Sequence, residues 1–134
     1  MSQENVEIVR RIYEQEMFGP DPDRLLDLAM PDIEYVNPPY AIESGVRRGR
    51  AEVAEAVKNA HQFFYSPRYE LHELFDYGDT VVAALSVYAR TGGAEHEIVQ
   101  EEAHTWTLRD GKIARFEWGR DLSTALEAAG LRDG

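Results

Sequence analysis

The sequence predicts an α+β fold in which helices pack on one face of a curved, mostly antiparallel β-sheet. Two observations lead to this prediction. In the first half of the chain, apolar residues recur at helical spacing in three segments, with one short strand among them. In the second half, polarity alternates along four consecutive segments that are separated by turn residues, as is typical of a β-meander.

Three helices are expected in the N-terminal half. Their positions are residues 2–18, a short segment around 25–28, and residues 51–64. In the first helix, Val9, Ile12 and Met17 recur at the spacing that places side chains on one face. The second helix is expected to bury its leucines, Leu28 included, and to end at Pro31, because proline interrupts helical hydrogen bonding.

The strands are expected at residues 32–37, 69–77, 80–90, 96–108 and 112–120. Between the first strand and the third helix, residues 40–50 are expected to form a loop whose arginines are solvated. A short terminal helix is expected at residues 123–129, with Asp121 capping its start and Gly130 its end.

Residues 101–121 predict a β-hairpin that carries an unusual mixture of side chains on one face. Asp110 and Gly111 supply the turn, which we expect to be a three-residue loop with a bulge. Because strand side chains alternate, one face collects Glu102, His104, Trp106, Leu108, Phe116 and Trp118. The expected register places Phe116 opposite His104 and Trp118 opposite Glu102. Two indoles, a phenyl ring, an imidazole and a carboxylate together are more typical of a ligand pocket than of a plain core.

Composition excludes several classes of function. The formal net charge of −11 disfavours nucleic acid and anionic membrane surfaces as partners. No apolar run reaches the roughly 18 residues of a membrane-spanning helix, and the N-terminus lacks the features of a signal peptide. Without cysteine there is no thiol nucleophile, and the cytoplasm is the expected location. The histidines and acids show no metal-ligand spacing and the glycines no phosphate-binding motif, so neither metal nor cofactor is expected.

Four stretches together resemble the SnoaL-like branch of the NTF2-like superfamily. They read ENVEIVRRIYE, FDYGDTVVA, AHTWTLRDGK and STALEAAGL, in that order along the chain. The resemblance implies a cone-shaped fold over residues 1–134 as a single domain, with three helices on the concave side of the sheet around a deep pocket. It also implies homodimers in many members. Relatives include isomerases, cyclases, dehydratases and proteins that only bind, so the function must be argued from the site.

The resemblance also argues against steroid-isomerase chemistry. Ketosteroid isomerases place a general-base aspartate before a proline on the first strand, where this chain has Asn37, whose amide cannot take a proton at neutral pH. Their oxyanion-hole acid matches His104. Their oxyanion-hole tyrosine matches Ile12, and Tyr13 is expected to point about 100° away around the helix.

His104 is the best candidate for proton transfer, because its ordinary pKa lies near neutrality, and Glu102 on the same face is expected to set its charge. A buried imidazole without a chemical role remains the alternative. Tyr35 and Asn37 are expected to polarise a ligand carbonyl, or else to lie at the core rim and in a turn. The expected ligand-binding residues are Tyr35, Asn37, Leu85, Val87, Trp106, Phe116, Trp118 and Arg120.

Two classes of function follow from these candidates. The first is a lyase, isomerase or cyclase acting on a small hydrophobic polyketide-like or terpenoid-like molecule. The second is a non-catalytic protein that binds such a molecule in the same pocket. A homodimer is expected in either case, because residues 81–85 are apolar on both faces of one strand and nothing in the chain is expected to cover the outer face.

Overall fold

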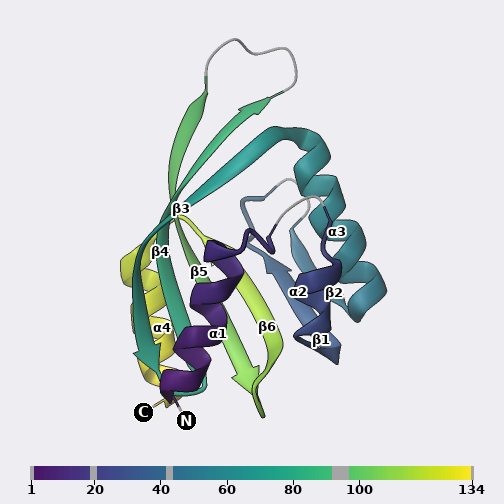
Figure 1. The fold of residues 1–134 in the computed structure, drawn as a ribbon. Helices are drawn as coiled ribbons and strands as arrows, with labels where there is room; N and C mark the ends of the chain where they lie inside the picture. Colours follow the sequence, from purple (N-terminus) through teal and green to yellow (C-terminus); the bar gives the residue numbers. More distant parts are fainter. Residues whose placement is uncertain (1, 19–20, 42–43, 92–96, 134) are drawn as a thin grey trace.

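The computed structural model describes residues 2–18, 21–41, 44–91 and 97–133, which form four helices and six strands (Figure 1). In chain order the elements are α1 (Ser2–Glu14), α2 (Asp23–Asp27), β1 (Ala29–Asn37), β2 (Gly45–Arg48), α3 (Arg50–Phe63), β3 (Phe64–Tyr77), β4 (Thr80–Thr91), β5 (Ile98–Arg109), β6 (Lys112–Gly119) and α4 (Leu122–Asp133). No helix in these ranges is long and apolar enough to cross a membrane.

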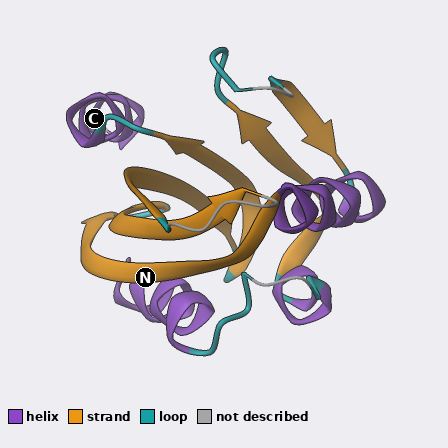
Figure 2. Ribbon diagram, turned by 90° about the horizontal axis from the view of Figure 1, so that it is seen from above, coloured by secondary structure: helices purple, strands orange, loops and turns teal. Residues whose placement is uncertain are grey.

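The six strands form one sheet in the order β2-β1-β6-β5-β4-β3. Strands β3 to β6 run as the predicted antiparallel meander, and β1 joins β6 in parallel. Figure 2 shows the strong curvature of the sheet. The predicted α+β class with a curved, mostly antiparallel sheet is therefore confirmed.

Helices α1, α2 and α3 pack on the concave face of the sheet, as predicted. The stripe of α1 that carries Val9 and Ile12 is fully buried, and α3 buries Val53 and Val57 in the same core. The sheet contributes the other half of this core, with Trp106 and other inward-facing side chains of β4 to β6. Burying one such aliphatic side chain stabilises the fold by about 1.5–3 kcal/mol.

Two elements near the first strand differ from the sequence prediction. Residues 45–48, expected to be loop, form β2, which pairs with β1 although no apolar alternation marks it. Strand β1 begins at Ala29, so Pro31 lies inside the strand instead of ending a helix. The register of β1 against β6 shifts between Ala29 and Glu34, and such an irregularity accommodates a residue without an N–H. Leu28 is only half-buried.

Helix α4 corrects two further expectations. It covers the convex face of the sheet, where Ala129 packs against Val82 and Ala103, so the outer face of β4 is partly covered within the chain itself (Figure 2). The helix also continues to Asp133, so Gly130 lies inside it and does not cap it.

The cap at the start of α4 is as predicted. The Asp121 carboxylate accepts hydrogen bonds from the Thr124 hydroxyl at 2.6 Å and from a backbone N–H at 3.0 Å, and these bonds hold its pKa below the ordinary value.

Because Gly130 lies within a helix, replacing it with alanine is expected to raise the free energy of unfolding by about 0.5–1 kcal/mol, the usual difference between the two residues in a helix. A Cβ at this position would meet Tyr77 Cε1 at 3.8 Å, an ordinary contact. Urea titration measures the change. The matched variant Gly111→Ala should be destabilised, because φ there is +77°. A loss of stability in Gly130→Ala would contradict this assignment.

Candidate functional site

The β5–β6 hairpin places the aromatic and titratable side chains of the site. Its turn has two residues, Asp110 and Gly111, with φ of 54° and 77°, which is the type I′ geometry that matches strand twist. The predicted three-residue loop is therefore wrong, and a register irregularity lies further along, between Thr107 and Leu108.

The observed register places His104 opposite Trp118 and Trp106 opposite Phe116. The predicted pairs were shifted by two residues. A shift of two leaves every side chain on its predicted face, because the period of a strand is two. The ring centroids of His104 and Phe116 accordingly lie 5.0 Å apart.

A cavity of about 260 Å³ opens among the concave face of the sheet, α3 and Phe18, which follows α1. Eight predicted residues line it: Tyr35, Asn37, Val87, Glu102, His104, Phe116, Trp118 and Arg120. Leu85 and Trp106, which were predicted to line it, instead lie in the core, each 1% exposed. Seven further residues complete the lining: Phe18, Ala60, Pro67, Tyr69, Ala89, Ile98 and Gln100.

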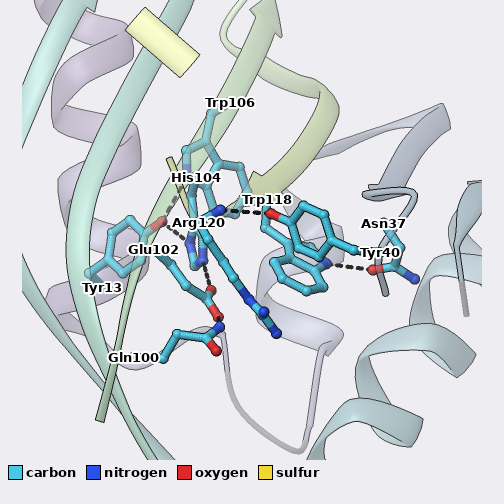
Figure 3. Close-up of polar contacts among 9 residues, drawn as sticks. All are labelled: Tyr13, Asn37, Tyr40, Gln100, Glu102, His104, Trp106, Trp118 and Arg120. Atoms are coloured by element: carbon cyan, nitrogen blue, oxygen red, sulfur yellow. Dashed lines mark hydrogen bonds and ion pairs between the residues drawn. The ribbon is translucent and has the colours of Figure 1, made fainter. Parts of the chain in front are cut away.

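A continuous chain of hydrogen bonds runs from the core to the cavity (Figure 3). The Trp106 indole N–H donates to the Tyr13 hydroxyl oxygen at 2.9 Å, and this oxygen lies 2.7 Å from His104 Nδ1. His104 Nε2 lies 2.9 Å from Glu102 Oε1. The Gln100 amide donates to the second carboxylate oxygen, Oε2, at 2.7 Å.

The donors in this chain limit how it can be arranged. An indole N–H can only donate, so the Tyr13 oxygen accepts from Trp106. When the Tyr13 hydroxyl directs its own hydrogen to His104 Nδ1, the ring hydrogen lies on Nε2 and is donated to Glu102. Both ring nitrogens are occupied and His104 is 1% exposed, so the imidazole has no position left for a ligand.

The Glu102 carboxylate is the polar end of this chain that faces the cavity. Its side chain is 13% exposed, and its neighbours include the hydroxyl groups of Tyr35 and Tyr69. Burial, reinforced by the negative charge of Glu102, raises the pKa of both tyrosines well above the ordinary value. These hydroxyls therefore stay protonated and can donate to a ligand oxygen, while the carboxylate can accept a proton or a hydrogen bond.

The mouth of the cavity is held by a second group of contacts. The Trp118 indole N–H donates to Asn37 Oδ1 at 2.5 Å, which fixes both side chains. The Tyr40 ring meets Trp118 edge-on, and its hydroxyl oxygen accepts the Arg120 backbone N–H at 2.8 Å. The Arg120 guanidinium lies over the Tyr40 ring, 5.0 Å from its centroid.

Sequence reasoning missed Tyr13 and Gln100. Tyr13 was expected to point away, yet it is buried and bonded to His104, because α1 packs with its Val9–Ile12–Tyr13 surface inward. Gln100 could have been found from the sequence, since it lies two residues before Glu102 on the same strand face. In the described part of the chain, no group of three or more histidines or acids could hold a metal ion. His96 lies outside the described residues.

A curved sheet that encloses an aromatic cavity, with helices on its concave side, defines the class of small-molecule pocket proteins with the NTF2-like cone fold. The sequence profile of the SnoaL-like domain matches residues 9–116, and the chain belongs to this family. The search of curated proteins found no match.

Solved structures support the same fold. A candidate SnoaL-like polyketide cyclase from Jannaschia sp. CCS1 superimposes with a TM-score of 0.78 at 15% identity, covering 96% of this chain and 93% of that one. A protein of ketosteroid isomerase-like fold from Catenulispora acidiphila DSM 44928, in complex with trimethylamine, gives 0.74 at 21% identity, with 92% of both chains covered. TerC, co-crystallised with polyporic acid, gives 0.74 at 25% identity and covers 94% of this chain and 98% of its own.

Proposed function

We propose that the cavity binds a small hydrophobic molecule and transfers a proton to or from it through Glu102 and His104. The reaction class is that of a lyase, isomerase or cyclase on a polyketide-like or terpenoid-like substrate. One observation carries the proposal: a carboxylate bonded to a buried imidazole faces an aromatic cavity. General acid–base chemistry needs such a group within hydrogen-bond reach of the ligand.

Within this pair the structure favours roles opposite to those predicted from sequence. His104 was expected to exchange the proton, but both of its nitrogens are already bonded. Glu102 retains exposed surface towards the cavity, so the carboxylate is the proton-transfer group and His104 positions it. Gln100 fixes the other carboxylate oxygen, which leaves the group in one orientation.

The tyrosines supply the second requirement of such chemistry, a donor for a ligand oxygen. Tyr35 and Tyr69 line the cavity as neutral hydroxyls. A hydroxyl aimed at a carbonyl stabilises the negative charge that develops on its oxygen when a neighbouring proton is removed. The polyketide-cyclase description of the Jannaschia relative and the polyporic acid held by TerC are consistent with a ring-bearing ligand.

A non-catalytic binding protein is the second candidate. The observation in its favour is that Asn37, at the position of the isomerase base, is engaged with the Trp118 indole. In that case Glu102, Tyr35 and Tyr69 would only orient a ligand.

Binding itself is tested by nuclear magnetic resonance with a library of small ring compounds. The chain has two tryptophans, so its spectrum contains two indole N–H signals. A cavity ligand should shift the Trp118 signal more than that of Trp106, which lies in the core. Val87→Phe, which fills the cavity, should abolish the shift, whereas Tyr88→Phe on the opposite face of the same strand should preserve it. Ligands that shift neither signal would contradict the cavity as the site.

We also propose a homodimer through the part of the outer sheet face that α4 leaves uncovered. Val99 at the start of β5 is 53% exposed there. Light scattering at micromolar concentration should give twice the chain mass of 15.3 kDa. A monomer mass would contradict the proposal.

A further inference from the structure

We infer that Phe18 sets the upper size limit of the ligand, because its ring separates the cavity described above, the main cavity, from a second cavity between α1 and β3. The inference deepens the proposed function and rests on it, since it concerns the ligand of the same site. It narrows that ligand to molecules of one or two rings and makes Phe18 a specificity-determining residue.

The second cavity has a volume of about 380 Å³. Ile12 and Tyr13 form its α1 side, and Arg68 and Tyr69 of β3 lie on its other side. Glu16 and Arg68 are exposed, and β3 is an edge strand, so this cavity opens to solvent at the edge of the sheet. It is therefore a space into which a ligand of the main cavity could extend if the wall between them were removed.

Three residues line both cavities: Phe18, Pro67 and Tyr69. Among these three, Phe18 is the one that does not belong to β3, and its ring reaches across the concave face of the sheet. The ring centroid lies 5.3 Å from that of Tyr69 on β3 and 5.1 Å from that of Phe116 on β6, and two strands lie between β3 and β6. Phe18 is 6% exposed, so its ring fills the space that would otherwise join the two cavities.

The volume of the main cavity gives the size limit. At about 260 Å³ it is smaller than the roughly 300–1,000 Å³ of pockets that enclose drug-sized molecules. A molecule of one or two rings can be enclosed there, whereas a further ring would have to remain at the mouth or displace Phe18. Removal of the phenyl ring would make the second cavity accessible from the first.

Two compounds, 2-naphthol and 6-phenyl-2-naphthol, provide a direct test, because they share a two-ring hydroxylated head and differ by one phenyl group. Both are titrated while the Trp118 indole N–H signal is followed, and the ratio of their Kd values is determined. In the unaltered protein the phenyl group should improve binding by less than about threefold, because it has no enclosed space to enter. An improvement of about tenfold or more, the usual effect of burying a phenyl ring, would overturn the inference.

Substitutions at Phe18 should change this ratio. In Phe18→Ala the phenyl group should improve binding by about tenfold or more, because it can now be buried in the second cavity. Phe18→Leu, which keeps a branched apolar side chain, should shift the ratio in the same direction by a smaller factor, and it provides the test if Phe18→Ala does not fold. An unchanged ratio in the folded Phe18 variants would overturn the inference.

Phe75→Ala is the matched control for these substitutions. It removes the same ring from the outer face of the sheet, where Phe75 packs against the cluster of Val82, Ala103 and Ala129. Because Phe75 lines neither cavity, the ratio of Kd values should remain that of the unaltered protein. A rise in Phe75→Ala equal to that in Phe18→Ala would show that general loosening of the fold, and not the wall at Phe18, admits the larger compound.

The outcome also separates this inference from the proposed function. If 2-naphthol shifts the Trp118 signal and the ratio does not respond to Phe18, the main cavity binds small molecules and the size limit is wrong. If neither compound shifts that signal in any of these proteins, both proposals fail together.

Discussion

Replacing Glu102 with glutamine is expected to lower turnover by about 10²–10⁴-fold, the usual contribution of a general acid–base group. The amide keeps the size of the side chain but cannot accept a proton. Its oxygen can still accept the His104 Nε2–H, so the fold should persist. The rate is measured with any substrate that the cavity-binding screen yields, with kcat and KM determined separately.

Two variants make the result specific to Glu102. Glu101→Gln, on the opposite face, should leave turnover unchanged. His104→Gln should lower kcat less than Glu102→Gln does, because it removes a positioning contact and keeps the carboxylate. Full activity in Glu102→Gln together with lost activity in His104→Gln would reverse the two roles.

Replacing Tyr13 with phenylalanine is expected to lower the free energy of unfolding by about 2–6 kcal/mol, since it leaves two buried polar groups without this partner and each costs about 1–3 kcal/mol. The change removes the acceptor of the Trp106 indole N–H and the donor to His104 Nδ1 at once. Both partners are 1% exposed, so water cannot easily replace the hydroxyl. Urea titration gives the value.

Tyr88→Phe is the matched control for this loss. Its hydroxyl lies on the outer face and bonds Glu70 at 3.4 Å in contact with solvent. Its removal should change stability by less than about 0.5 kcal/mol, as is usual for surface groups. A Tyr13→Phe protein as stable as this control would show that the buried hydrogen-bond chain contributes nothing to folding.

The hairpin face was predictable because a strand has a period of two. His104 and Phe116 share a face even though the predicted register was shifted by two residues. Such a shift does not change which face a side chain lies on, because side chains alternate with a period of two. The contact between His104 and Glu102 was less accessible to sequence. On a straight strand the two side chains leave about 7 Å apart, and their observed 2.9 Å hydrogen bond needs the two side chains to converge.

Tyr13 and α4 show where single-sequence reasoning reached its limit. The helical pattern of α1 identifies an apolar stripe but not how the helix is rotated against the sheet, so Tyr13 was wrongly expected to point away from the site. Similarly, the sequence pattern of α4 predicted a terminal helix, but it did not indicate which face of the sheet the helix covers. Both depend on packing between segments far apart in the chain.

The central proposal is that His104 Nδ1 accepts from Tyr13 and Nε2 donates to Glu102, so that the carboxylate of Glu102 is the group presented to a ligand. Nitrogen-15 magnetic resonance of the histidine ring distinguishes the forms directly, because protonated and unprotonated ring nitrogens have distinct shifts. At neutral pH the account predicts an unprotonated Nδ1 and a protonated Nε2 for His104, and loss of this form in Tyr13→Phe. Protonation of both nitrogens, or of Nδ1 alone, would contradict it.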